Sequence, residues 1–358
     1  MELLSVTMND GVMPRTEIEG KDNSSEDKSN YKVVCKGDMV YNSMRMWQGA
    51  NGVSNYDGIV SPAYTVLMPT EEIDNQYFAA LFKTSNLINE FRKNSQGLTS
   101  DTWNLKYPQI RPIRLYIPSL QEQNKISSFI GTLEERISKQ RQLVDSLKKY
   151  KRGVMQKVFR NMSAFSPSGF ETVRLSDIFK KASRRNSNGE IKNVITNSAE
   201  HGLIPQRDFF DKDIAVDGNT GNYYVIEYGD FVYNPRKSNT APYGPFNRYE
   251  RQEKGIISPL YTCLVLKTDI EPAYLAWYFK SDAWYRYIYD NGSQGVRHDR
   301  VSMTDDLLMG MPVIIPSKDS QIKIAKLLDC LEKRFQVELS QCEYLKTVRE
   351  ALLQQLFI

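Results

Sequence analysis

The chain has 358 residues, of which 41% are hydrophobic and 25% charged, and its formal net charge is only +4. This length allows two ordinary domains, since a single core rarely grows beyond about 250–300 residues. The small net charge excludes a polycation that coats DNA without discrimination, and no run of about 18 apolar residues could span a bilayer. Because residues 1–10 lack a basic segment leading into an apolar one, we expect a soluble, cytoplasmic protein.

The four cysteines show no metal-binding spacing. Cys35, Cys263, Cys330 and Cys342 include no C-x-x-C pair, and only two histidines are available to complete a zinc site. Cys330 and Cys342 lie on one predicted helix, about 18 Å apart at the standard rise, which is too far for a disulfide. We therefore expect reduced thiols, no metal and no cofactor.

One sequence pattern occurs twice along the chain. Gly11 and Pro14 return as Gly202 and Pro205, 191 residues later, and the spacing between matched residues drifts only to 198. Small insertions in the surface connections of a duplicated fold produce such a drift. The matched segments are LLSVTMNDGVMPR (3–15) with VITNSAEHGLIPQR (194–207), YKVVCKGDMVYN (31–42) with YYVIEYGDFVYN (223–234), GIVSPAYTVL (58–67) with GIISPLYTCL (255–264), SQG at 95–97 and 293–295, and IPSLQEQNKI (117–126) with IPSKDSQIKI (315–324).

The first part of each copy, residues 1–119 and 169–316, predicts a mixed domain. Alternating β-branched and aromatic residues, with Gly-Asp, Asn-Gly and Ser-Pro between them, indicate short strands joined by turns. One helical stretch interrupts the strands in each copy, at 75–93 and 272–290. The fold class that follows is α+β, with two target domains in tandem.

The second part of each copy, residues 120–160 and 317–358, predicts a long helix. Apolar residues recur at spacings of four and three over about five heptads. A run of about 38 residues spans about 57 Å, which is longer than a small domain is wide. A helix packed on its own domain is the alternative, but two such seams in one chain most simply bury each other as an antiparallel coiled coil, which would be a rod that fixes the spacing of the two domains.

Polar residues interrupt the two predicted seams at matching places, Gln140 with Lys151 and Glu338 with Arg349. The apolar seam residues are Ile126, Ile130, Leu133, Ile137, Val144, Leu147, Val154 and Val158 in the first helix, and Ile324, Leu328, Leu331, Phe335, Cys342, Leu345, Leu352 and Leu356 in the second.

Catalytic motifs are missing from the sequence. It contains no phosphate loop, no dinucleotide-binding fingerprint and no H-E-x-x-H zinc motif. Asp177, Glu190 and Lys192 loosely match the spacing of a metal-dependent nuclease, but such triplets arise by chance among 47 basic and 43 acidic residues, and the first copy lacks this one. We predict that the chain is not an enzyme.

The copies differ most in the loops between matched strands. Segments 43–57 and 235–254 hold the side chains that read base edges, Arg for guanine and Asn or Gln for adenine. The turn after each domain's helix, 94–103 and 291–300, is a second candidate surface, in which we treat His298 as structural. Solvated, turn-forming loops are the alternative interpretation. The candidate DNA-binding residues are Arg45, Trp47, Gln48, Asn51, Gln96 and Thr99 in the first copy, and Arg236, Lys237, Asn239, Tyr243, Asn247, Arg248 and Arg297 in the second.

The order of these motifs, occurring twice over essentially the whole chain, resembles the specificity subunit of a type I restriction–modification system. Each copy carries an L-S-V-T…G-V-x-P-R-like strand, G-D-x-V-Y-N, and I-P-x-x-x-x-Q-x-x-I or a near variant leading into the long helix. The resemblance implies two target-recognition domains that each read half of a split site on double-stranded DNA, with paired helices setting the gap. It also implies partners, namely two modification (methyltransferase) subunits that use S-adenosylmethionine, and motor–nuclease restriction subunits. An adaptor that binds proteins through the same loops is the alternative function.

The copies also differ at their N-terminal ends. Residues 169–193, GFETVRLSDIFKKASRRNSNGEIKN, precede the first matched strand of the second copy and resemble the usual opening of a domain in this family. The first copy starts almost directly at its LLSVT strand and lacks about two dozen residues by this comparison. We hypothesise a shortened gene product or a misplaced start, and we expect the first domain to be less stable than the second.

Overall fold

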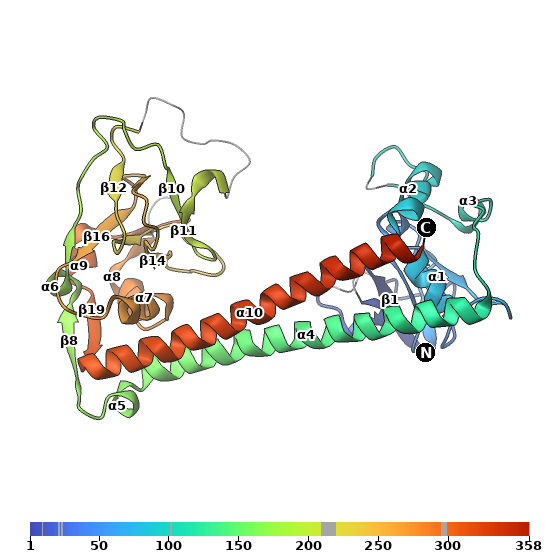
Figure 1. Ribbon diagram of the computed structural model, residues 1–358, viewed down its shortest axis with the longest axis horizontal. Coiled ribbons are helices and arrows are strands. Elements are labelled where there is room, and N and C mark those ends of the chain that lie inside the picture. Colours follow the sequence, from blue (N-terminus) through green and yellow to red (C-terminus); the bar gives the residue numbers. More distant parts are fainter. Residues whose placement is uncertain are drawn as a thin grey trace. The chain divides into compact units, whose positions relative to one another are not determined.

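The computed structural model describes residues 1–8, 10–20, 22, 24–100, 102–208, 220–294 and 299–357. These residues form two units, one made of Met1–Val144 with Val337–Ile358 and the other of Asp145–Gln336. Each unit contains one mixed domain and part of both long helices, α4 (Leu120–Arg160) and α10 (Lys318–Leu356) (Figure 1). The predicted α+β class, with tandem domains and two long helices, is confirmed.

The domain of unit 1 contains a four-stranded sheet of order β2-β1-β6-β3, in which β1 and β6 are parallel, and a three-stranded antiparallel sheet of order β5-β4-β7. Helices α1 and α2 contact the second sheet and the loop that follows β4. The elements are β1 (Glu2–Thr7), β2 (Gly11–Pro14), η1 (Arg15–Glu17), β3 (Lys32–Val34), β4 (Met39–Asn42), η2 (Met46–Gln48), β5 (Asn51–Val53), β6 (Gly58–Val60), β7 (Tyr64–Leu67), α1 (Asn75–Leu81), α2 (Ser85–Asn94) and α3 (Tyr107–Ile110).

The domain of unit 2 is built around a sheet of order β14-β13-β16-β9, and β8 pairs antiparallel with β19. The register of the matched central strands is the same in both units, since Met39 faces Leu67 and Phe231 faces Leu264. The elements are α5 (Met162–Phe165), β8 (Phe170–Arg174), α6 (Leu175–Ile178), β9 (Phe179–Lys181), β10 (Ile195–Ser198), β11 (Gly202–Pro205), η3 (Gln206–Asp208), β12 (Tyr224–Ile226), β13 (Phe231–Tyr233), β14 (Phe246–Arg248), β15 (Gly255–Ile257), β16 (Thr262–Leu266), α7 (Pro272–Lys280), α8 (Tyr285–Asn291), β17 (Ser293–Gln294), β18 (Val301–Ser302), α9 (Asp305–Met309) and β19 (Pro312–Pro316).

The repeated Gly-Asp pair forms the turn that leads into each central strand. Gly37 and Gly229 have φ values of 99° and 93°, in the left-handed region that side chains with a Cβ rarely adopt. The carboxylates of Asp38 and Asp230 each accept the backbone N–H three residues upstream at 2.8 Å. The motif is therefore a structural requirement of β4 and β13, which explains why both copies keep it.

The repeated Ile-Pro…Gln motif fastens the start of each long helix to its domain. Gln123 is buried, and its Oε1 accepts the backbone N–H of Asp74 at 3.0 Å. Gln321 is equally buried, and its Oε1 accepts the backbone N–H of Glu271 at 2.8 Å. Asp74 and Glu271 are the N-cap residues of α1 and α7. One buried amide therefore joins the N-termini of two helices in each unit.

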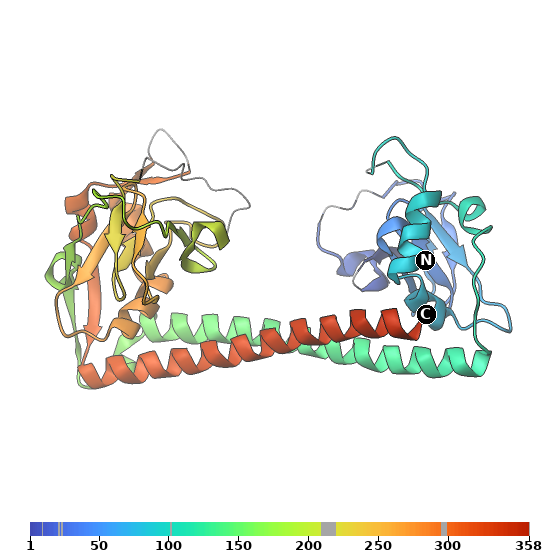
Figure 2. The same ribbon diagram turned by 45° about the horizontal axis from the view of Figure 1, so that its top comes forward.

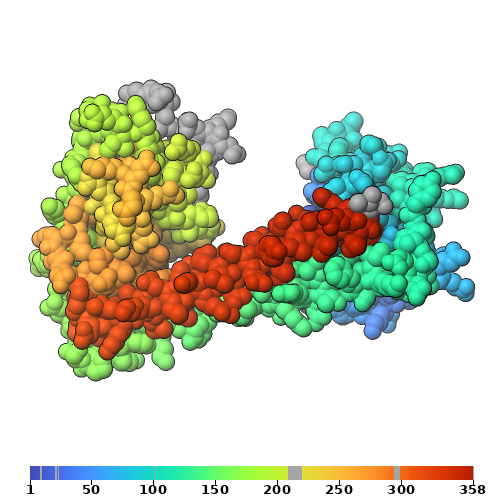
Figure 3. All heavy atoms as spheres, in the orientation of Figure 1, coloured from blue at the N-terminus to red at the C-terminus, as the bar shows by residue number. Residues whose placement is uncertain are grey.

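The long helices run antiparallel within each unit, as predicted. In unit 1 the buried residues are Ile130, Ile137 and Val144 of α4 with Cys342, Leu345 and Leu353 of α10; in unit 2 they are Val158 with Ile324 and Leu328. Figure 2 shows the two ribbons side by side within each unit, and Figure 3 shows the atoms of α10 against those of α4.

The end of the second seam departs from the prediction by one residue. Leu353 is buried, whereas the predicted Leu352 is half-buried. Leu353 packs against Ala80 of α1 as well as Ile130 of α4. The last turns of α10 thus face the domain and the partner helix together, which rotates the buried face away from a strict seam.

A hydrogen-bonded pair fills the first predicted interruption of each seam. The Gln140 Nε2 donates to the carbonyl oxygen of Glu338 at 2.9 Å and to its Oε2 at 2.7 Å. Glu338 is buried. Because a buried polar group is costly unless it is hydrogen-bonded, this pair favours the alignment in which both partners meet.

An equivalent ion pair fills the second interruption in each unit. Arg349 lies 3.1 Å from Glu134 in unit 1, and Lys151 pairs with Glu332 in unit 2. Both partners recur at an offset of 198 residues, so the repeat duplicates the whole pair. These side chains are only partly exposed, which reduces screening by solvent, and the pairs reinforce the same antiparallel alignment.

All four cysteines are free thiols, and their exposure predicts a labelling pattern. Cys35 and Cys330 are exposed, whereas Cys263 and Cys342 are buried. Burial raises the pKa of the Cys263 thiol to about 12, so almost no reactive thiolate forms at pH 8. We expect iodoacetamide to modify Cys35 and Cys330 in the native protein, and Cys263 and Cys342 only after denaturation, as measured by peptide mass spectrometry. Alkylation of Cys263 at the rate of Cys35 would contradict the packing of β16.

Among the residues that the structure describes, no helix combines the length and the apolar character needed to cross a membrane.

Candidate nucleic-acid interface

In unit 1 the two candidate segments, 43–57 and 94–103, lie together. The backbone N–H of Leu105 donates to the carbonyl oxygen of Ser43 at 2.8 Å, which ties the end of the second segment to the start of the first. Gln96 and Asn104 form an antiparallel bridge that closes the turn between them. Two loops far apart in sequence therefore make one surface, which we call the unit 1 loop surface (43–50 and 94–105).

Aromatic contacts hold the unit 1 loop surface together. The Trp47 ring stands edge-on to the Trp103 ring, with centroids 5.2 Å apart, and the Arg92 guanidinium lies 5.7 Å from the centroid of Trp47. Arg45, Gln96 and Thr99 are exposed on this surface, while Trp47 and Gln48 are half-buried. Sequence reasoning overlooked Arg92, because nothing in its position near the end of α2 indicates that it reaches the loop 45 residues upstream.

Asn51 does not lie where the sequence suggested. It is fully buried, and its Nδ2 donates to the carbonyl oxygen of Gly49 at 3.1 Å. The cause is its place at the start of β5, opposite Tyr41, which turns the side chain inward. Asn51 supports the loop from below and does not reach its surface.

Unit 2 joins its two candidate segments in the same way. The backbone N–H of Val301 donates to the carbonyl oxygen of Pro235 at 2.9 Å, which is the counterpart of the Leu105 to Ser43 bond. Lys237 also donates its N–H to the carbonyl oxygen of Asp299 at 2.8 Å, and Arg236 bridges Arg300. We call this the unit 2 loop surface (235–243 and 299–302).

The side chains of the unit 2 loop surface differ from those of unit 1. Arg236 is 67% exposed and lies 3.7 Å from Asp299, a contact that water screens strongly and that a phosphate or a base could replace. Asn239 is exposed, while Lys237 is half-buried. Tyr243 packs on Tyr285 with centroids 5.0 Å apart. The scaffold is shared, but the chemical groups offered to a ligand are not.

Asn247 and Arg248 are corrections to the sequence-based set. Asn247 is buried, and its Nδ2 donates to the Oδ1 of Asn197 at 2.7 Å. The Arg248 side chain is mostly buried, with its guanidinium 5.4 Å from the Tyr228 ring centroid and 4.0 Å from Glu250. Both belong to β14, whose pairing with β13 fixes their direction. Arg297 and His298 lie outside the described residues.

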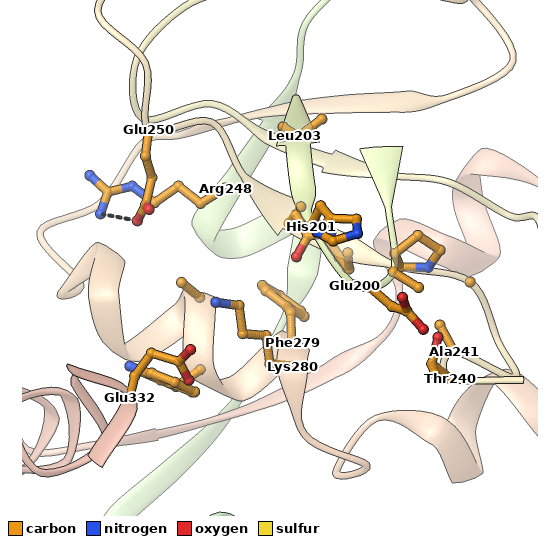
Figure 4. Close-up of a pocket in the computed structure, with 18 of the residues that line it drawn as sticks. Glu200, His201, Leu203, Thr240, Ala241, Arg248, Glu250, Phe279, Lys280 and Glu332 are labelled. Atoms are coloured by element: carbon orange, nitrogen blue, oxygen red, sulfur yellow. Dashed lines mark ion pairs between the residues drawn. The ribbon is translucent and has the colours of Figure 1, made fainter. Parts of the chain in front are cut away.

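A cavity of about 550 Å³ lies in unit 2 between the β10–β11 turn, the loop before β14, α7 and the long helices. Figure 4 shows its main charged side chains: Arg248 with Glu250, Glu200 beside His201, Lys280 of α7, and Glu332 of α10. Its charges are largely matched, because Arg248 pairs with Glu250 and Lys151 pairs with Glu332. Among the described residues, no cluster of His, Cys, Asp and Glu is placed to hold a metal ion.

The charged groups of this cavity recur in unit 1. A cavity of about 370 Å³ there is lined by Lys83 of the domain and Glu134 of α4, the counterparts of Lys280 and Glu332. Burial lowers the pKa of Lys83, while Glu134 favours its charged form. Because the copies agree in these groups and differ in their loop surfaces, we assign the two cavities to the scaffold that joins each domain to the helices.

Comparison with known proteins places these features in a family. Residues 5–149 match the family described as the type I restriction modification DNA specificity domain. The HindI specificity subunit of the type I restriction enzyme from Haemophilus influenzae is 26% identical over 152 residues, which cover 41% of this chain and 32% of that relative. The chain thus spans about a third of the length of the curated relative that it matches.

Two solved structures share the fold across nearly the whole chain. The S subunit of a type I restriction–modification system from M. genitalium is 13% identical, covers 99% of this chain and 94% of its own, and has a TM-score of 0.55. A chain from a study of complex assembly and conformational transition in a type I R-M system is 17% identical, with coverages of 93% and 84% and a TM-score of 0.56.

Proposed function

We propose that this chain, whose residues 5–149 belong to the type I restriction modification DNA specificity family, reads a split site on double-stranded DNA, one half with each domain. The observation that carries the proposal is the contrast between the copies. They share strand register, helix docking and interhelical pairs, yet their joined loop surfaces present different side chains. One scaffold with two different reading surfaces suits a target whose two halves differ in sequence.

The division of labour follows the repeat. Residues 1–119 and 169–316 are the recognition domains, and residues 120–160 and 317–358 are the spacer helices that fix the unread gap. The helices also offer a surface for two modification subunits, which bring S-adenosylmethionine and methylate adenine. Motor–nuclease restriction subunits join them for cleavage. The chain itself contributes recognition and no catalytic group.

The reading residues are the exposed and half-exposed side chains of the two loop surfaces. Arginine pairs with guanine and glutamine or asparagine with adenine through two hydrogen bonds each, and aromatic rings contact thymine methyl groups or neighbouring bases. Arg92 and Trp103 support Trp47 from behind. The proposed set is Arg45, Trp47, Gln48, Gln96 and Thr99 for the first half-site, and Arg236, Lys237, Asn239, Tyr243 and Arg297 for the second.

An Arg236→Ala substitution is expected to relax one half-site and leave the other unchanged. A bidentate arginine contact contributes about 1–3 kcal/mol of discrimination between bases. The measurement is selection from random-sequence duplexes by the complex with modification subunits, followed by footprinting at two salt concentrations. Arg45→Ala should relax the opposite half-site. Loss of preference in both halves with either variant would argue against separate readers.

Matched controls separate base reading from general attraction to DNA. Lys267 and Lys36 are exposed and lie next to the ends of β16 and β4 that are remote from the loop surfaces. Lys267→Ala and Lys36→Ala remove the same charge without removing a base contact, so the selected sequences should not change. If no sequence preference emerges for the unaltered complex at moderate salt, the chain is not a DNA reader.

A further inference from the structure

Unit 1 lacks the strand that completes the central sheet of unit 2. In unit 2, β9 covers the outer edge of β16, pairing from Phe179 with Leu266 to Lys181 with Leu264. In unit 1 the counterpart of β16 is β7, which ends its sheet with no further strand among the described residues. An uncovered edge presents unpaired backbone N–H and C=O groups, which are a template for another strand.

The side chains beside this edge record the difference. Leu264 is fully buried in unit 2, but its counterpart Leu67 is only half-buried. Val265 is half-buried, whereas its counterpart Met68 is 79% exposed. The same strand, in the same register with its inner neighbour, is therefore less covered in unit 1.

A second edge is open in unit 1. In unit 2, β8 pairs with β19 along five residues, from Phe170 with Pro316 to Arg174 with Pro312. The counterpart of β19 is segment 114–118, which forms no strand. Its Tyr116 is fully exposed, while the matching Ile314 is half-buried. Two backbone edges that a single segment covers in unit 2 are thus both uncovered in unit 1.

An apolar pocket of about 260 Å³ lies between these edges, lined by residues of β4, β7, α1, α2 and α3. In unit 2 the equivalent place is filled by the buried side chains of Leu175, Ile178 and Phe179. The Phe179 ring lies 5.1 Å from Phe231 and 6.2 Å from Phe279, measured between centroids. The counterparts of those two rings, Met39 and Phe82, line the pocket of unit 1. The pocket is therefore the empty equivalent of the Phe179 site.

We propose that unit 1 binds a segment of another polypeptide with the pattern of Phe170–Lys181: a strand, a Leu-x-x-Ile-Phe turn, and a second short strand. The strands would pair with segment 114–118 and with β7, and the three apolar side chains would fill the pocket. Backbone pairing supplies affinity in such strand addition, and the pocket supplies specificity. The pattern present in this chain is already used in the core of unit 2, so the donor is a different molecule.

The test is binding of a fluorescein-labelled peptide of residues 168–183 to the full chain. The matched control peptide carries L175S, I178S and F179S. We expect saturable binding that is at least about a hundredfold weaker for the control peptide, because three buried apolar groups are lost. Hydrogen exchange should show new protection at 64–69 and 112–118, and none at 262–266.

Variants of the chain locate the binding site. Met68→Asp and Tyr116→Pro change exposed residues of the two edges, so the fold should persist, which circular dichroism checks. Both should abolish peptide binding, whereas Tyr150→Asp, at an exposed position of α4, should not. Equal binding of the control peptide, or binding that survives both edge variants, overturns the proposal. So does a concentration-dependent dimer that Tyr116→Pro dissociates, because the occupant would then be a second copy of this chain.

Discussion

Phe246→Ala is expected to lower the free energy of unfolding of unit 2 by about 3–5 kcal/mol, the usual cost of removing a buried aromatic ring. Phe246 is almost completely buried, and its ring stacks on Phe279 with centroids 3.9 Å apart. It also begins β14, directly after the loop that carries Arg236 and Tyr243. The second half-site should therefore lose protection in footprinting, while the first is still read.

Phe246→Leu is the matched control for this loss. Leucine keeps an apolar side chain in the site and leaves a smaller cavity, so the free energy of unfolding should fall by less than half as much. Urea denaturation followed by hydrogen exchange would assign the change to a unit. Equal weakening of both half-sites by Phe246→Ala would mean that the loop surfaces do not act separately.

Lengthening both long helices by one heptad should widen the unread gap by about three base pairs. Seven residues add about 10.5 Å to a helix, and base pairs are spaced by about 3.4 Å along DNA. Insertions after Val144 and after Gln336 fall at the boundaries between the units, so each unit keeps its own interhelical pairs. Selection from duplexes with variable spacers measures the preferred gap.

An insertion in α4 alone is the control for the double insertion. It leaves one helix without an equal partner, so a loss of stability is expected in place of a clean change in spacing. If the double insertion leaves the preferred gap unchanged, the helices do not act as the ruler.

The scaffold was predictable because the duplication shows each signal twice. The seam residues of α4 and α10 repeat with the same interruptions, and a break seen twice indicates a designed position. Its meaning required three dimensions: Gln140 meets Glu338, and Lys151 meets a glutamate that the spacing alone does not identify. The Leu353 shift arises from a contact with Ala80, which heptad spacing does not include.

The reading surface was harder to predict, because residue type says nothing about which face of a short strand is buried. Asn51 and Asn247 have the chemistry of adenine readers, but strand pairing turns both inward. The hydrogen bond from Asn247 to Asn197 crosses 50 residues of sequence and has no local signal. Arg45 and Arg236 differ from them only in preceding or following the strand, where the backbone is free to present them outward.

The interhelical pairs also bear on how two molecules of this chain avoid exchanging helices. Either helix could match its own kind at the flanking pairs, because Glu134 and Glu332 would each still meet a basic residue. The central position differs. Glu338 beside a second Glu338 would bring two carboxylates together in a buried seam, whereas Gln140 accepts the single charge with two hydrogen bonds. One substitution between otherwise equivalent repeats thus penalises self-association of the second helix and favours partnership within one chain.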